Sequence, residues 1–384
     1  MNAFKRVAAA AIAFATMAAC LAGCGDKAEN SGTGEKTGEF FIGSTGPLTG
    51  DASSYGISVQ RGAQLAVDEI NEAGGLNGYK FKFEMKDDKA TAEDAATGYD
   101  ALMDAGMQIS IGSVTSGSCE SFASKSVEDN LFFMTPSASA ANVIADRANA
   151  FRVCFGDPDQ GTLAAQELTK SFTKIGAIYD TSDTYSTGVY NAFKAEMKNL
   201  GVEYNEQSFD AENKKDFSTQ VEALKDCEVI FLPIYYTEAG LIAKACAAKS
   251  CNALLFGCDG FDGVADQIDD TVTNSIKYIT PFDVNSTDAT VSKFVTAFKA
   301  KYSADPDQFA ADGYDAVYAI YNTMKAAVDA GTDLNPKTDA STMCEAVKKA
   351  ITDKSFSYKG ATGDMTWDAT GACTKVPQIV DLSK

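Results

Sequence analysis

The 384-residue chain contains no histidine. This absence restricts function, because histidine is the most frequent general base at neutral pH and a common metal ligand. Ser-His-Asp triads, Cys-His pairs and histidine-containing zinc sites are therefore excluded. Carboxylates, lysines and tyrosines can still support catalysis, so composition disfavours an enzyme without excluding one. We expect no catalytic residue, no metal and no cofactor.

Basic residues are also scarce relative to acids. Lysine and arginine number 33 and aspartate and glutamate number 53, which gives a net charge of −20. A chain this acidic lacks the basic surface that binds polyanions, so nucleic acid is excluded as a partner. Its hydrophobic content of 45% and its charged content of 22% are those of a globular protein, and its length predicts about two or three domains.

The N-terminal hydrophobic run is short. It covers residues 7–22 after a basic N-terminus and falls short of the roughly 20 residues that cross a bilayer, so it predicts a secretory signal. The run ends in LAGC, residues 21–24, which resembles a bacterial lipobox. We expect residues 1–23 to be the signal peptide and Cys24 to carry the lipid. The alternatives are a cleaved signal with an incidental cysteine, or cleavage before Cys20.

Small and polar residues follow the lipobox. Residues 24–38 are rich in glycine and polar side chains and contain no large apolar residue, which predicts a flexible tether. The acidic body that follows should not adhere to anionic headgroups, so we expect the lipid on Cys24 to hold it at the membrane. The expected location is extracytoplasmic and lipid-anchored to the cell membrane.

The cysteines beyond Cys24 are even in number, which permits disulfides in an exported chain. Cys246 with Cys251 and Cys344 with Cys373 are candidate pairs, and buried free thiols are the equal alternative. No CxxC pair is present, so a thiolate metal site is disfavoured. The cysteines are Cys119, Cys154, Cys227, Cys246, Cys251, Cys258, Cys344 and Cys373.

Short apolar strands alternate with amphipathic helices along the rest of the chain. The first strand is expected at residues 40–42, and the helix after it carries one apolar stripe and ends at the Gly-Gly of residues 74–75. The alternation over residues 79–86 predicts a strand at a sheet edge. Further strands are expected at residues 108–112, 131–135, 175–179, 229–235, 253–256 and 276–279. This order is typical of two α/β lobes with parallel sheets.

Hydroxyl residues follow two of the predicted strands. Residues 112–118 (GSVTSGS) place Ser116 where the next helix begins, and residues 135–139 (TPSAS) repeat the design. Free N–H groups and the helix dipole at such a place attract a carboxylate or a phosphate, whereas the alternative is ordinary N-capping. Both turns are expected at the same edge of an open sheet. Because the pattern occurs twice there, the sequence supports an anion-binding site as well as it supports ordinary N-capping.

An acid and two aromatic residues occupy corresponding places after the strands predicted in the second half of the chain. Asp259 follows the strand predicted at residues 253–256, at the edge where open sheets bind ligands. Tyr185 and Tyr235 also fall in loops near that edge. The alternatives are a turn or cap role for the acid and core packing for the two rings.

Many short segments in order match one family. They include GPLTG at residues 46–50, GGLNG at residues 74–78 and GYDA at residues 313–316. Over about residues 39–370 the chain resembles the substrate-binding lipoproteins of branched-chain amino acid (leucine/isoleucine/valine) ABC transporters. Further matches are Asp87 and Asp88, residues 151–152 with Asp157, residues 160–161, residues 216–218 and Trp367.

The resemblance implies a type I periplasmic binding protein fold, an α/β architecture of two Rossmann-like lobes joined by a three-segment hinge that closes on a ligand. Hinge strands are expected near Phe155, Thr280 and Cys373. The N-terminal lobe would comprise residues 39–155 plus 281–372, and the C-terminal lobe residues 156–280 plus 373–384.

The resemblance also implies a ligand site. By position, Ser116 and Ser139 match the hydroxyls that hold a ligand's α-carboxylate, and Asp259 matches the acid that receives its α-ammonium. Asp259 is shorter by one methylene than the glutamate frequent there, and Thr115 stands where the family has a disulfide. The remaining expected ligand contacts are the aromatic walls Tyr55, Tyr185 and Tyr235, with Val114 and Ala138.

The expected function is capture of an amino acid, branched-chain or similar, and its delivery to the membrane permease of an ABC importer. We expect a monomer that performs no chemistry. Two alternatives remain: a sensory component that signals through a membrane partner, and a carboxylate-dependent hydrolase. The lack of a second hydrophobic span weakens the first alternative, and the lack of histidine weakens the second.

Overall fold

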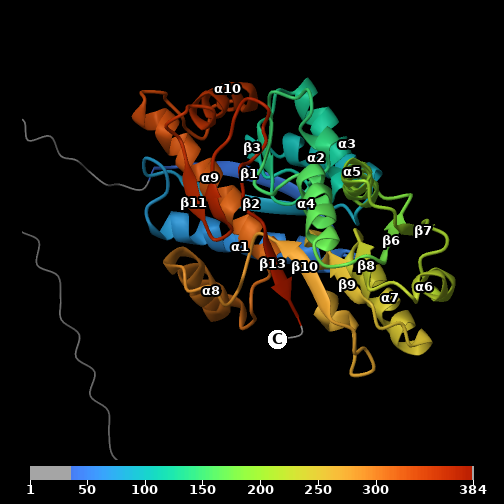
Figure 1. The fold of residues 1–384 in the computed structure, drawn as a ribbon. Coiled ribbons are helices and arrows are strands. Elements are labelled where there is room, and N and C mark those ends of the chain that lie inside the picture. Colours follow the sequence, from blue (N-terminus) through green and yellow to red (C-terminus); the bar gives the residue numbers. More distant parts are fainter. Residues whose placement is uncertain (1–35, 383–384) are drawn as a thin grey trace, which may run out of the picture. The chain divides into compact units, whose positions relative to one another are not determined.

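The computed structural model describes residues 36–382, which fold around two large β-sheets (Figure 1). The expected signal peptide, Cys24 and most of the expected tether lie outside the described residues. Across residues 36–382, no helix combines the length and the apolar character needed to cross a bilayer.

The first sheet has five parallel strands in the order β2-β1-β3-β4-β5. The predicted edge strand is confirmed, since β2 lies at one end of this order. Strand β3 is shorter than predicted because the chain turns at Gly112, whose φ of 67° suits a residue without a side chain. The strands are β1 (Glu39–Gly46), β2 (Lys80–Asp87), β3 (Ile109–Ser110), β4 (Phe133–Thr135) and β5 (Ala150–Arg152).

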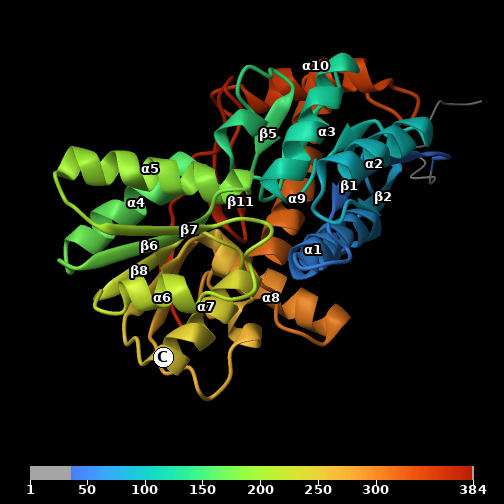
Figure 2. The same ribbon diagram turned by 90° about the vertical axis from the view of Figure 1, so that its right-hand side faces the viewer.

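Helices α1 (Ser53–Glu72) and α9 (Gln308–Asp329) lie side by side in this first lobe (Figure 2). Their backbones touch where each helix has a glycine. A Cβ atom on Gly62 would run into the Ala310 carbonyl, and one on Gly313 would lie 2.5 Å from the Val59 carbonyl. The lobe also contains α2 (Ala92–Asp104), α3 (Ser116–Glu128), α8 (Ala289–Tyr302), α10 (Ala340–Ile351) and the hairpin of β11 (Tyr358–Gly360) and β12 (Gly363–Met365).

The second sheet has six strands in the order β13-β10-β9-β8-β6-β7. Helices α4 (Asp157–Thr169) and α5 (Thr184–Leu200) cover one face, and α6 (Ser218–Leu224) and α7 (Tyr236–Lys249) cover the other (Figure 2). The prediction of two α/β lobes with parallel sheets is confirmed, and the one exception in the second sheet is the edge strand β13, which runs antiparallel to β10. The strands are β6 (Ile175–Asp180), β7 (Asn205–Phe209), β8 (Val229–Leu232), β9 (Leu254–Gly257), β10 (Ile276–Thr280) and β13 (Gln378–Asp381).

The chain passes between the two sheets three times, after β5, after β10 and between β12 and β13. Phe155 lies in the first passage, Thr280 precedes the second and Cys373 lies in the third. Hydrogen bonds connect the passages to their surroundings. The indole N–H of Trp367 donates to the carbonyl of Arg152 at 2.7 Å, and the hydroxyl of Thr280 donates to Gln308 Oε1 at 2.7 Å.

A buried lysine lies in the third passage. The Lys375 side chain is fully buried, and its ammonium lies 3.2 Å from Asp312 Oδ1 on α9. It also donates to the hydroxyl of Thr362 at 2.6 Å. Burial alone would lower the pKa of Lys375, but the charges of Asp312 and Asp315 outweigh it and raise that pKa. The passage is thereby joined to the first lobe by a charged network.

The eight cysteines in residues 36–382 are unbridged. Neither candidate pair, Cys246 with Cys251 or Cys344 with Cys373, is bridged in the structure. Cys344 donates to Asn130 Oδ1 at 3.5 Å and Cys373 donates to the carbonyl of Thr374 at 3.6 Å.

Candidate functional site

A small cavity of about 20 Å³ lies between the two lobes, where the strands of both sheets end. All of the predicted site residues except Ala138 line it. Ala138 is fully buried in the core of the first lobe, where it packs with residues such as Phe133. The lining residues are Tyr55, Val114, Thr115, Ser116, Ser137, Ser139, Tyr185, Tyr235, Asp259, Gly260 and Phe309.

The first lobe presents hydroxyl groups to this cavity. Helix α3 begins at Ser116, and its N-cap residue Thr115 makes no side-chain cap bond. The Thr115 and Ser139 hydroxyls are buried without a hydrogen-bond partner, and the Ser116 hydroxyl accepts the N–H of Ala140 at 3.2 Å. The first N–H groups of a helix have no partner within it and carry the positive end of its dipole. This edge can therefore hold a carboxylate.

The second lobe presents a buried acid, Asp259. Its backbone is fixed on both sides, because its N–H donates to Gln160 Oε1 at 3.1 Å and its carbonyl accepts Gln308 Nε2 at 2.7 Å. Its Oδ1 is buried without a hydrogen-bond partner. Burial raises the pKa of Asp259 to about 6, and the nearby Tyr185 hydroxyl and Gln160 oppose that rise. A buried carboxylate of this kind is stabilised by a cationic partner.

A second buried acid, Asp157, was not among the predicted site residues. It is the first residue of α4, and both of its carboxylate oxygens lack hydrogen-bond partners. Burial raises the pKa of Asp157 well above the ordinary value, the approach of the Ser139 hydroxyl lowers it, and the charge of Asp259 raises it further. Asp157 is therefore near enough to Asp259 for their charges to interact, but it does not line the small cavity.

Aromatic rings close the cavity. Tyr55 stacks on Phe309 with ring centroids 4.1 Å apart, and Tyr185 stacks on Tyr235 with centroids 5.2 Å apart. Tyr55 joins the lobes, since its hydroxyl donates to the Gly260 carbonyl and accepts the N–H of the residue after Tyr235 at 3.1 Å. Phe309 was also not predicted. It reaches the site because α9 begins there, a position set by tertiary structure.

A larger open cavity of about 330 Å³ adjoins the small one and shares Tyr235 with it. Both lobes line it, with Asp51 from the first and Lys214 and Glu238 from the second. The Lys214 ammonium lies 3.5 Å from a carboxylate oxygen of each of these two acids, so it links the lobes at the mouth of the cleft.

The chemistry of the small cavity is that of a binding site for a molecule with two opposite charges. Hydroxyls and a helix N-terminus lie on one side, and Asp259, with an unpaired carboxylate oxygen, lies on the other. Within residues 36–382, no group of three or more Cys, Asp or Glu side chains is placed to hold a metal ion.

Comparison with known proteins gives one consistent family. The sequence profile of a family described as periplasmic binding protein matches residues 39–375. The Leu/Ile/Val-binding protein BraC3 of Rhizobium johnstonii is 29% identical over 351 residues, covering 88% of this chain and 89% of that protein. The Leu/Ile/Val-binding protein homolog 3 of Brucella melitensis is 28% identical over 339 residues, covering 87% and 88%.

Solved structures of similar proteins share the fold. The leucine binding protein LivK of Thermotoga maritima superposes with a TM-score of 0.78 at 24% identity, covering 88% of this chain and 94% of that one. The branched-chain amino acid transporter substrate binding protein LivJ of Streptococcus pneumoniae, in complex with isoleucine, gives a TM-score of 0.75 at 25% identity, covering 89% and 99%. A solute binding protein of R. palustris, in complex with benzoate, gives 0.77 at 20% identity, covering 90% and 96%.

Proposed function

The chain belongs to the periplasmic binding protein family, and from this membership we propose that it captures an amino acid between its two lobes and delivers it to an ABC importer. Its fold is the type I periplasmic binding protein fold, and the family implies an extracytoplasmic location. The relatives are named as binding proteins, which supports a receptor without catalytic activity.

The observation that carries the proposal is the pairing of opposite charges across the cleft. The hydroxyl-lined start of α3 faces the buried, unpaired acid Asp259. In the proposal, Ser116 and Ser139 hold the ligand carboxylate, and Asp259 holds its ammonium. Hydrogen bonds to charged groups contribute about 1.5–3 kcal/mol each, so a few of them support micromolar affinity.

The buried acid Asp259 favours one of the ligand classes bound by proteins of this fold. Benzoate carries a carboxylate but no ammonium, and it would leave Asp259 without a cation. An amino acid satisfies both sides of the cavity, as the isoleucine complex of the Streptococcus pneumoniae protein illustrates for a relative. Asp259 therefore favours an amino acid, branched-chain or similar, over an aromatic acid.

The proposal has further parts that concern the whole protein. We infer that Cys24 carries a lipid, that residues 24–38 form the tether and that the protein works as a monomer with a membrane permease. The lobes comprise residues 39–155 plus 281–372, and residues 156–280 plus 373–384. The three passages between the sheets support this division.

A thermal-shift screen of the soluble form, residues 38–384, against the twenty amino acids tests the function. A ligand stabilises the native state by RT ln(1 + [L]/Kd), about 2.7 kcal/mol at a hundredfold excess over Kd. We expect a clear rise in melting temperature with at least one amino acid. The matched controls are the same molecule without its amino group and benzoate, which should give no rise. Equal stabilisation by these controls would contradict the proposal.

Ligand affinity should depend on pH through Asp259. Its pKa of about 6 in the free protein means that it is protonated below that value and cannot balance an ammonium. Because a bound ammonium favours the ionised form, the apparent Kd should rise by about tenfold for each pH unit below about 6 and level off above it. Titration calorimetry across this range measures the effect, and an affinity that stays constant on acidification would argue against the acid as the ammonium acceptor.

A further inference from the structure

The end of helix α7 brings two cysteines together. The residue after the helix, Ser250, is left-handed with φ 55° and ψ 34°. The N–H of Cys251 donates to the carbonyl of Cys246 at 2.9 Å, and the N–H of Ser250 donates to the carbonyl of Ala247 at 3.3 Å. These two bonds form a Schellman motif, in which the first and last residues of the bonded turn commonly pack side chain against side chain.

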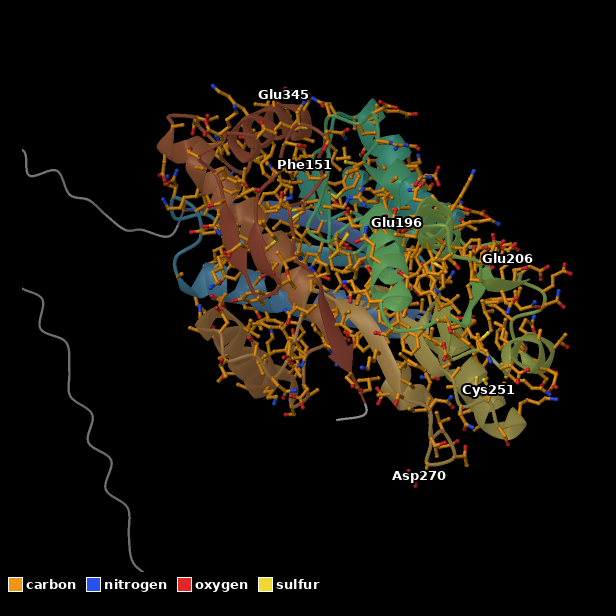
Figure 3. The ribbon with its side chains drawn as sticks, viewed as in Figure 1. Phe151, Glu196, Glu206, Cys251, Asp270 and Glu345 are labelled. Atoms are coloured by element: carbon orange, nitrogen blue, oxygen red, sulfur yellow. The ribbon has the colours of Figure 1, made fainter. Side chains whose placement is uncertain are left out.

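Here both packed residues carry a thiol. Cys246 is 0% exposed and Cys251 is 1% exposed, and their thiols lie near enough for each to shift the pKa of the other. The chain after the turn is held in place, because the side-chain amide of Asn274 donates to the carbonyls of Cys251 and Ala253 at 2.9 and 2.8 Å. Figure 3 shows Cys251 beside the end of α7, well away from Phe151 of the first lobe. The turn thus brings the two thiols near each other, as a disulfide requires.

We propose that Cys246 and Cys251 form a disulfide in the exported protein. The proposal rests on the extracytoplasmic location implied by the family, where disulfides form and persist. The oxidant is a second disulfide, either of a thiol–disulfide exchange protein or of a small thiol such as glutathione. The Cys251 thiolate attacks one sulfur of the oxidant and displaces a thiolate, and the Cys246 thiolate then attacks the Cys251 sulfur and displaces the second. The cysteine pair loses two electrons and two protons, and the oxidant becomes two thiols.

Two neighbours act on Cys251, and one of them competes with Cys246 for it. The hydrogen bond from the Cys246 thiol lowers the pKa of Cys251, with burial opposing it. Cys227 lies near enough to Cys251 for their charges to interact. The Schellman turn favours Cys246 over Cys227, because it fixes Cys246 and Cys251 in one short segment.

Alkylation mapping of the full chain tests the proposal. The protein is exported in a bacterial host, purified without reductant, denatured and treated with N-ethylmaleimide before trypsin digestion. Trypsin cleaves after Lys249, between the two cysteines, so the Cys246 and Cys251 fragments stay together only if a disulfide links them. The expected result is one linked pair of fragments with label on Cys258, which shares the Cys251 fragment. Label on both Cys246 and Cys251, or a fragment that links Cys227 to Cys251, would overturn the proposal.

Substitutions separate this disulfide from the amino-acid site. C227S should retain the linked fragments, whereas C246S should lose them. Exported C246S should melt at a lower temperature than the unsubstituted protein, and reductant should lower the melting temperature only of the latter. A melting temperature that is insensitive to both the substitution and the reductant would count against the disulfide. The rise in melting temperature on adding an amino acid is a separate readout, so failure of ligand binding and failure of the disulfide are distinguished.

Discussion

Asp259→Asn should weaken amino-acid binding by about thirtyfold to several thousandfold. Removing one partner of a buried, hydrogen-bonded charge pair costs about 2–5 kcal/mol of binding free energy, which gives this range in Kd. The stability of the ligand-free protein should increase. Because burial of the acid raises its pKa, the ionised form is disfavoured in the folded state, and an amide of the same shape should raise the melting temperature above pH 6. Calorimetric titration and thermal unfolding measure the two effects.

The matched control for this change is Asp270→Asn. Asp270 is exposed in the loop before β10 (Figure 3), so the same chemical change there should leave both affinity and melting temperature unchanged. An Asp259→Asn protein that binds amino acids as tightly as the unsubstituted protein would refute the assignment of Asp259 as the ammonium acceptor. Loss of binding together with loss of folding would refute it as well, because the expected variant is the more stable one.

Lys375→Met should destabilise the folded protein by about 3–5 kcal/mol, the usual cost of leaving one buried charge without its partner. Methionine keeps the length of the side chain and removes the only ammonium within 4.0 Å of Asp312 in residues 36–382. Burial already raises the pKa of Asp312 to about 7, with Lys375 opposing the rise. Without the lysine that pKa rises further. The folded variant then holds a proton that the unfolded chain releases near pH 4, so its stability should recover as the pH falls toward 4.

Denaturant unfolding of three further proteins completes this test. Lys354→Met, at an exposed lysine, should change stability little. Asp312→Asn combined with Lys375→Met removes both charges and should regain most of the loss, since replacing both partners of a buried pair is often close to neutral. Asp312→Asn alone leaves Lys375 without its ion-pair partner, with only the charge of Asp315 remaining nearby, and should destabilise. If Lys375→Met unfolded at the same denaturant concentration as the unsubstituted protein, the buried ion pair would have no structural importance.

The sequence pattern predicted most of the sheet strands, because their residues are apolar and their order alternates with helices. It made β8 too long. The strand was predicted to reach residue 235 but ends at Leu232, because Pro233 has no N–H to donate to a neighbouring strand. Strand β7 was not predicted because its residues, NEQSF, are mostly polar, and it forms by pairing with β6. The antiparallel course of β13 could not be predicted, because it depends on where the third passage delivers the chain.

Some residues of the candidate site could likewise be predicted from the sequence, and others could not. Ser116, Ser139 and Asp259 could be named because each follows a strand, and the family resemblance gave each an expected role. Asp157 was overlooked because an acid before a proline at the start of a helix is common for local reasons. Its lack of partners is visible only when burial is known.

The contact between α1 and α9 also sets the order in which the molecule can be completed during synthesis. Gly62 lies on the backbone of Ala310, and nearly all of the second sheet is encoded between these two positions. The first lobe cannot finish its core until α9 has left the ribosome, by which time every strand of the second sheet except β13 has been made. Contacts of such long sequence separation slow folding. An export route that keeps the chain unfolded until its C-terminus has crossed the membrane would therefore suit this topology.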